Sequence, residues 1–156
     1  MIKNNVTRML DARGISYTTY ELPVEKIGAI ETARLLGVDA GLIFKTIVIS
    51  CEGKGKPILA VIPGDKEVDL KALAQAVGEK KVYLSTQREA EKITGLQTGG
   101  ISPLALLNRG FQVILDASAL DLTEMHISAG QRGLNLRLPT TALIDVTAAK
   151  LAAVSK

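Results

Sequence analysis

The strongest constraint on the fold is a pair of apolar runs joined by a short glycine-rich turn. "LIFKTIVIS" covers residues 42–50, "KPILAVIP" covers residues 56–63, and "EGKGK" connects them. Side chains alternate between the two faces of a strand, and in these runs both alternating sets are mostly apolar. A strand that is apolar on both faces is typical of a sheet covered on both sides. The sequence therefore predicts two paired strands at the centre of a layered fold.

Lys45 interrupts the first of these runs. An unpaired ammonium inside an apolar strand is costly to remove from water. Either this side chain serves as a ligand group at a pocket, or its long aliphatic stem carries the charge out to solvent. The pattern of the strand alone leaves both interpretations open.

Further helices and strands surround this pair. Apolar residues at helical spacing, each set followed by a glycine, predict helices in residues 2–14 and in "AIETARLLGV", "DLKALAQAVG" and "TQREAEKITG". Strands are predicted in "SYTTYEL", "KKVYLS", "FQVILD", "TEMHIS" and "LNLRLP", and the tail "TTALIDVTAAKLAAVSK" is partly helical in pattern. The late strands follow one another closely, which favours antiparallel pairing. We therefore expect an α/β fold, a mixed β-sheet surrounded by helices, in a single domain over residues 1–156.

The composition indicates where the protein is expected to work better than it indicates what the protein does. The chain has 19 Lys and Arg against 16 Asp and Glu, and this net charge of +3 does not by itself indicate a nucleic-acid partner. Cys51 is the only cysteine, so no intrachain disulfide and no cluster of thiolate ligands can form. No segment has the pattern of a signal peptide or the ~20 apolar residues of a membrane span. We expect a cytoplasmic protein with no membrane partner.

Two glycine-containing loops could form a binding site. "TGLQTGGISPL" carries Gly99 and Gly100, which permit positive φ and close approach of a ligand, and Pro103 fixes the exit of the loop. Consecutive N–H groups in such a loop can bind a carboxylate, a carbonyl or a developing oxyanion. The second loop, "SAGQRGLNL", carries Ser128 and Arg132. Taken alone, the Gly99-Gly100 pair is better explained as a plain turn, and it is the combination of two such loops with Lys45 that favours a site.

A hydrolytic triad is the less favoured reading of "TEMHIS". Strand alternation places Glu124, His126 and Ser128 on one face, but side chains two apart on a strand run parallel rather than converging. A polar strand face is the simpler interpretation. His126 is the only histidine, so a multi-histidine metal centre is impossible, and we expect no cofactor. Cys51 has no basic partner nearby in sequence and reads as a small apolar filler.

The lysine strand and the two glycine loops together resemble one known family. "FKTIVI", "TGLQTGGISPL" with its Gly99-x-x-x-Pro103 spacing, and "SAGQRGLNLRL" are similar in order and spacing to the YbaK/EbsC family of aminoacyl-tRNA deacylases. That family is related to the editing domain of bacterial prolyl-tRNA synthetases. The subgroup that this chain resembles is the free-standing Cys-tRNA(Pro) deacylases. The resemblance implies a single α/β domain with a pocket between the lysine strand and the glycine loops.

The resemblance also implies roles for particular residues. It places the catalytic lysine at Lys45 and further substrate-binding positions at Tyr20, Gly99, Gly100, Ile101, Ser102, Pro103, Ser128, Gly130 and Arg132. Asn135 stands where many relatives have an acidic residue, which calls the role of a carboxylate there into question. The segment from Glu21 to Ala33 does not match the family pattern clearly, although it borders the pocket in relatives.

The activity implied by the resemblance is hydrolysis of a mischarged aminoacyl-tRNA, with Cys-tRNA(Pro) as substrate and the substrate's own thiol as nucleophile. An activated ester needs positioning and charge stabilisation rather than a protein nucleophile, which agrees with the missing triad. The implied partners are aminoacyl-tRNA(Pro) and prolyl-tRNA synthetase. Two alternatives remain: removal of another small amino acid such as alanine or serine, and a non-catalytic module that binds tRNA or the synthetase.

Overall fold

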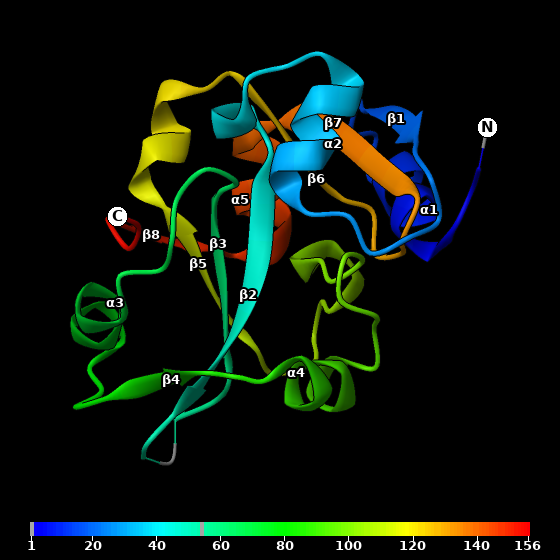
Figure 1. Cartoon of the computed structure of the whole chain (residues 1–156). Coiled ribbons are helices and arrows are strands. Elements are labelled where there is room, and N and C mark those ends of the chain that lie inside the picture. The colour runs from blue at the N-terminus through cyan, green and yellow to red at the C-terminus, as the bar shows by residue number, and fades with distance from the viewer. Residues whose placement is uncertain (1, 54) are drawn as a thin grey trace.

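The computed structural model describes residues 2–53 and 55–156 (Figure 1). Its helices are α1 (Asn5–Ala12), α2 (Ala29–Leu36), α3 (Leu70–Val77), α4 (Gln87–Thr94) and α5 (Thr140–Thr147), with short 3₁₀ turns η1 (Ala40–Leu42), η2 (Pro103–Ala105) and η3 (Ala117–Asp121). Its strands are β1 (Thr18–Glu21), β2 (Phe44–Cys51), β3 (Ile58–Pro63), β4 (Val82–Leu84), β5 (Gln112–Asp116), β6 (Glu124–Ser128), β7 (Leu134–Pro139) and β8 (Lys150–Ala152).

Local sequence signals set the helix ends. Asp69 begins α3 by accepting a hydrogen bond from the N–H of Ala72, and Thr86 forms a capping box with Glu89 at the start of α4. Gly95 ends α4 in the left-handed conformation, which costs glycine little because it has no Cβ. These are the boundaries expected from the sequence, and they fix the loop that follows α4.

The larger sheet has five strands in the order β4-β2-β3-β5-β8 (Figure 1). β2 pairs antiparallel with β3 and β4, whereas β5 is parallel to both β3 and β8. On one face Ile49 and Ile58 pack with Leu73 of α3, and on the other Val48 packs with Ala90 of α4. The predicted coverage of both faces of β2 and β3 is therefore confirmed.

A second sheet departs from the single sheet that we expected. β1, β7 and β6 form a separate three-stranded antiparallel sheet in the order β1-β7-β6. Its apolar face, including Ile127 and Leu136, shares a core cluster with Phe44 and Val61 of the larger sheet. Antiparallel pairing of the late strands is correct for β6 and β7 but wrong for β5. The two sheets share one core, and the expected α/β fold with a mixed β-sheet surrounded by helices is confirmed, the larger sheet being the mixed one.

The tail contains one element that the sequence did not reveal. After α5 the chain forms β8, which adds a parallel strand at the edge of the larger sheet beside β5. Among the described residues, no helix combines the length and the apolar character that crossing a membrane would require.

Candidate functional site

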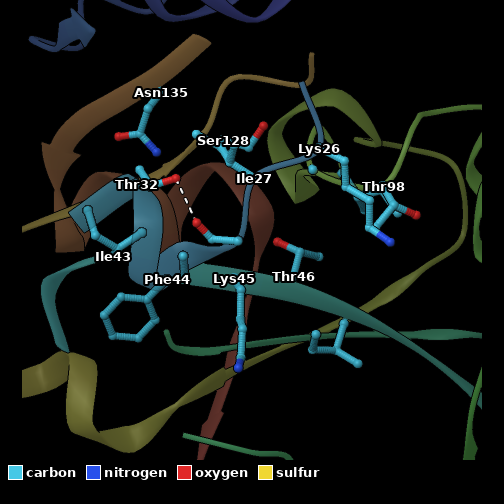
Figure 2. Close-up of a pocket in the computed structure, with 15 residues that line it drawn as sticks. Lys26, Ile27, Thr32, Ile43, Phe44, Lys45, Thr46, Thr98, Ser128 and Asn135 are labelled. Carbon is cyan, nitrogen blue, oxygen red and sulfur yellow. Dashed lines mark hydrogen bonds between the residues drawn. The ribbon is translucent and has the colours of Figure 1, made fainter. Parts of the chain in front are cut away.

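A cavity of about 260 Å³ lies beside the first half of β2. It is lined from four parts of the chain: α2 with the segment before it, strand β2 with the residue before it, the loop that follows α4, and the neighbouring strands β6 and β7 (Figure 2). The lining residues are Lys26, Ile27, Gly28, Ala29, Thr32, Ile43, Phe44, Lys45, Thr46, Ile47, Thr98, Gly99, Ile101, Ser128 and Asn135. The cavity therefore lies between the lysine strand and the glycine loops.

One edge of β2 is uncovered at this cavity. The Ile43 carbonyl accepts from Gly64 N–H on the β3 side, and the Val48 carbonyl accepts from Ser85 N–H on the opposite side. Peptide groups alternate along an antiparallel strand, so those of Thr46 point away from β3, in the same direction as those of Val48. β4 pairs only with Ile49–Cys51, and β6 meets this segment only through a bridge between His126 and Ile43, so no strand of the described chain is paired with Thr46 on that side. An open edge of this kind can hydrogen-bond an extended ligand.

Two threonine hydroxyls at the cavity lack partners. Thr46 Oγ1 and Thr98 Oγ1 are buried, and within the described part of the chain neither has a hydrogen-bond partner. The hydroxyl of Thr32 differs, because it donates to the Gly28 carbonyl at 3.0 Å within the first turn of α2. Buried polar groups without partners are uncommon and costly. Their gathering at one cavity is what a site that binds a polar ligand would show.

Lys45 has its ammonium on the other face of β2. Lys45 and Thr46 extend from opposite faces of the strand, and Figure 2 shows the lysine side chain pointing away from Ser128 and Asn135. Lys45 Nζ donates to the Gly64 carbonyl at 3.3 Å, and the residue is half-buried. Its charge thus lies across β2 from the polar groups of Ser128 and Asn135.

Hydrogen bonds fix the loop after α4. Glu91 accepts from Thr98 N–H at 2.8 Å, and this bond holds the pKa of Glu91 below its usual value. Arg132 Nε donates to the Thr98 carbonyl at 2.7 Å. Gly100 N–H donates to the Gln97 carbonyl at 2.8 Å, so that donor is already satisfied within its own loop. Gly99 lines the cavity at φ +95°, a conformation that favours glycine.

The two glycine loops pack directly against each other. A Cβ added at Gly100 would lie 2.7 Å from the carbonyl carbon of Gln131 and 2.8 Å from Arg132 N. A Cβ at Gly130 would lie 2.9 Å from the Cβ of Ala105. The close approach that glycine allows at Gly100 is therefore an approach of one loop to the other.

The polar face of the smaller sheet forms the opposite wall. Ser128 and Asn135 are direct neighbours across β6 and β7, and both line the cavity. His126 is 4% exposed, and its Nδ1 lies 3.1 Å from Asn135 Oδ1. Burial is the main cause that lowers the pKa of His126. Ser128 Oγ accepts from Gly130 N–H at 3.2 Å, and Glu124 pairs with Arg137.

A triad of Glu124, His126 and Ser128 is therefore not formed, as expected from their parallel placement on β6. Cys51 lies at the far end of β2 and does not line the cavity. Burial, reinforced by the nearby Glu79, raises the pKa of its thiol, which disfavours the reactive thiolate. Among the described residues, no three His, Cys, Asp or Glu side chains are grouped as metal ligands would be.

The structure brings some of the expected site residues together at the cavity and leaves others behind it. Lys45, Gly99, Ile101 and Ser128 line the cavity. The expected residues outside the lining are Tyr20, Gly100, Ser102, Pro103, Gly130 and Arg132. Two of these lie behind the wall: Arg132 donates to the Thr98 carbonyl, and the ring of Tyr20 lies 5.3 Å from that of His126.

Residues from the segment before α2 and from its first turns were not foreseen. Lys26, Ile27, Gly28 and Thr32 line the cavity, although the sequence of this segment carries no motif. The hint was the resemblance, which implies that the segment from Glu21 to Ala33 borders the pocket without assigning a role to any residue in it. Asn135, noted as a departure from the family pattern, also lines the cavity.

Comparison with known proteins agrees with this geometry. Residues 25–146 match the family described as "Aminoacyl-tRNA editing domain". Over 155 residues the chain is 35% identical to EbsC of Enterococcus faecalis, proposed as a Cys-tRNA(Pro)/Cys-tRNA(Cys) deacylase, with 98% of this chain and 93% of EbsC covered. It is 32% identical over 108 residues to the prolyl-tRNA editing protein ProX of Acetoanaerobium sticklandii, covering 68% of this chain and 64% of ProX.

A solved structure extends the match to the whole fold. The chain superimposes with a TM-score of 0.83 on the crystal structure of a protein proposed as a trans-editing enzyme for prolyl tRNA synthetase. That match covers 100% of this chain and 99% of the other at 26% identity. The resemblance carried by the lysine strand and the glycine loops is confirmed, and the chain belongs to the aminoacyl-tRNA editing domain family.

Proposed function

We propose that this protein is a trans-editing hydrolase that cleaves the ester of a mischarged aminoacyl-tRNA, with Cys-tRNA(Pro) as its substrate. The observation that carries the proposal is the cavity beside β2, where the hydroxyls of Thr46 and Thr98 lack partners and no nucleophile has a base beside it among the residues that the structure describes. A site of this kind can position a reactive ester without forming a covalent intermediate. Membership in the editing family supports the same reaction.

The substrate supplies the nucleophile in this proposal. In a cysteinyl ester the thiolate sulfur attacks the ester carbonyl carbon, a C–S bond forms, and the C–O bond to the ribose breaks. The ribose oxygen leaves with a proton, and water later opens the cyclic thioester to free cysteine. The roles left to the protein are to hold the ester in a reactive geometry and to exclude competing conformations.

Each wall of the cavity has a distinct role in this proposal. The peptide groups of Thr46 and the hydroxyls of Thr46 and Thr98 hold the aminoacyl group. Lys45 contacts the phosphate or ribose of the terminal adenosine rather than the developing oxyanion, because its ammonium lies on the other face of β2 from Ser128 and Asn135. Lys26, also in the lining, adds positive charge where a nucleic-acid end would enter.

Release of the amino acid from purified aminoacyl-tRNAs tests this function. We expect Cys-tRNA(Pro) to be cleaved faster than Ala-tRNA(Pro), with correctly charged Pro-tRNA(Pro) left intact. Faster cleavage of an alanyl or seryl ester would move the assignment to another small amino acid. Binding of tRNA without cleavage of any ester would leave only a binding module and would overturn the hydrolase.

We further propose that residues 1–156 act as one editing domain in the cytoplasm, where charged tRNA is used. Prolyl-tRNA synthetase is the proposed second partner, because ProX and the solved relative are named for prolyl-tRNA editing. Co-sedimentation of the purified protein with the synthetase, with and without tRNA(Pro), measures whether this contact is direct.

A further inference from the structure

The amide of Asn135 is held by a buried histidine. His126 and Asn135 lie on the same face of neighbouring strands, and His126 Nδ1 is 3.1 Å from Asn135 Oδ1. The two residues are 4% and 6% exposed, so little water reaches either of them. An amide oxygen only accepts hydrogen bonds. In this arrangement Nδ1 must carry a proton and donate it to Asn135.

The environment favours a neutral ring with that one proton. Burial is the largest influence on the pKa of His126 and lowers it, with Arg137 acting in the same direction, and together they outweigh the opposing influence of the Asn135 hydrogen bond and of Glu124. A neutral imidazole has a single N–H, so its place at Nδ1 defines the tautomer and leaves Nε2 with a lone pair. The histidine thereby fixes which end of the Asn135 amide faces the cavity.

The nitrogen of Asn135 points toward the cavity. Figure 2 shows this nitrogen on the side of Thr32 and the oxygen on the far side. Within the described part of the chain, no acceptor is bonded to Asn135 Nδ2. The cavity wall therefore presents two free N–H donors beside Ser128.

No acidic residue is among the described lining residues of the cavity. The two lysines of the lining carry their ammonium groups elsewhere: that of Lys45 lies on the other face of β2, and that of Lys26 donates to Gln87. The acidic groups nearby are already engaged: Glu91 accepts from Thr98 N–H, and Glu124 pairs with Arg137. The charged or titratable groups that the described chain places beside His126 and Asn135 are Tyr20 on β1, Arg137 on β7 and Glu124 on β6, while Lys26 and Lys45 contribute only to the lining of the cavity.

Such a wall discriminates between the two forms of an amine. An ammonium has no lone pair and would meet the N–H donors of Asn135, with no carboxylate among the described lining residues to pair with. A neutral amine can accept a hydrogen bond from the amide. The α-amino group of an aminoacyl substrate titrates near pH 8, roughly as a free α-amino group does, so both forms are present around neutral pH.

We propose that His126 is a positioning residue that fixes the Asn135 amide with its N–H groups toward the cavity, so that the site binds the aminoacyl group with its α-amino group unprotonated. This inference rests on the proposed function, because it concerns how the same cavity holds an aminoacyl group. It assigns Asn135 to recognition of the amine and separates amine recognition from ester cleavage.

Direct binding tests the inference without any need for cleavage. The probe is 3′-(alanylamido)-3′-deoxyadenosine, which cannot be hydrolysed as an ester and has no titrating side chain, and its control is the lactyl counterpart with a hydroxyl in place of the amine. We expect the Kd of the alanyl probe, measured by calorimetry, to rise roughly tenfold or more from pH 8.5 to pH 6.5. The Kd of the lactyl probe should stay constant.

Two variants separate the roles of the pair. Asn135→Asp places a carboxylate in the same shape, and we expect it to reverse the pH dependence and favour the alanyl probe at pH 6.5. His126→Phe keeps a ring but removes the donor, and should weaken binding at pH 8.5 about tenfold, the loss of one good hydrogen bond. His126→Asn, whose amide nitrogen stands at the position of Nδ1, should recover part of that loss.

The sole histidine also gives a readout in the free protein. Nitrogen-15 NMR of the imidazole should show one neutral tautomer with its proton on Nδ1 at pH 7. A proton on Nε2, a Kd for the alanyl probe that does not change with pH, or no binding of either probe would each overturn the inference. A protein that binds the alanyl probe as expected but cleaves no aminoacyl-tRNA would instead refute the hydrolase and leave this inference standing.

Discussion

Lys45 and Thr46 are consecutive residues of β2 whose side chains leave the strand on opposite faces (Figure 2). The Thr46 hydroxyl faces the cavity and has no partner in the described chain, whereas the Lys45 ammonium donates to the Gly64 carbonyl. Two consecutive residues of an otherwise apolar strand thus place a hydroxyl on the cavity face of β2 and an ammonium on its opposite face. The first two predictions follow from this division.

Thr46→Val should stabilise the protein and reduce its activity. The substitution keeps the shape and removes a buried hydroxyl without a partner, so we expect the free energy of unfolding to rise by about 1 kcal/mol. If the hydroxyl binds the substrate, kcat/KM for Cys-tRNA(Pro) should fall about tenfold. Urea unfolding and the deacylation assay measure the two effects.

Thr140→Val is the matched control. Thr140 Oγ1 is also buried without a partner in the described chain, but Thr140 begins α5 and does not line the cavity. We expect the same direction of change in stability with unchanged deacylation. Equal kcat/KM in Thr46→Val and the wild type would show that the Thr46 hydroxyl plays no part in the reaction.

Lys45→Met should impair the use of tRNA more than the use of a short substrate. Methionine keeps most of the aliphatic stem and removes the charge, whose only hydrogen bond in the described chain is to Gly64. We expect KM to rise for Cys-tRNA(Pro), and the dependence of KM on salt to weaken because one phosphate contact is lost. Stability should hold, since a half-buried charge is removed. Unchanged KM and salt dependence would place Lys45 outside the site.

Element order could be predicted from the sequence because each element carries its own signal. The apolar alternation of β2 and β3, the Asp69 cap and the glycine that ends α4 are local features. The division into two sheets is not local. It depends on β7 pairing with β1, more than a hundred residues away in the chain, and no periodicity in either strand records that choice.

The residues of the site, too, could be predicted only where a local motif contains them. Lys45, Gly99 and Ser128 could be located because they lie in short matching motifs and also line the cavity. Lys26 and Thr32 line it as well, but they are brought there by the packing of α2, which no motif encodes. Strand β8 was missed for a similar reason, because three residues are too few to show a period.

Gly100→Ala should destabilise the protein as well as inactivate it. The sequence suggests that this glycine gives a ligand room, yet its missing Cβ faces the backbone of Gln131 and Arg132 at 2.7 to 2.8 Å. Backbone cannot move aside cheaply, so we expect a loss of about 1–3 kcal/mol in unfolding free energy. Thermal unfolding and deacylation should both be affected.

Gly28→Ala is the control for a glycine that lines the cavity but has no close packing contact. Gly28 lines the cavity at φ −80°, and no atom of the described chain lies within 4 Å of an added Cβ. We expect this variant to keep its stability within about 0.5 kcal/mol. If Gly100→Ala proved as stable as Gly28→Ala, the contact between the two glycine loops would not be what requires glycine at position 100.

The last prediction concerns the identity of the nucleophile. Cys51 is remote from the cavity and its thiol pKa is raised, mainly by burial, so Cys51→Ala should keep nearly full activity. No acyl-enzyme should accumulate, because no described side chain at the cavity pairs a nucleophile with a base. Mass spectrometry of the protein quenched during turnover checks for a covalent adduct.

The substrate's thiol should then be essential. A well-oriented intramolecular attack reaches effective molarities on the order of 10⁵ M or more, so S-methylation of the cysteinyl ester should slow its release sharply at the same protein concentration. The serine ester, with a weaker nucleophile at the same position, is the matched control and should also be slow. Cleavage of the S-methylated ester as fast as the free thiol would mean that a bound water attacks instead. Loss of activity in Cys51→Ala would point to a protein nucleophile despite the distance of Cys51 from the cavity.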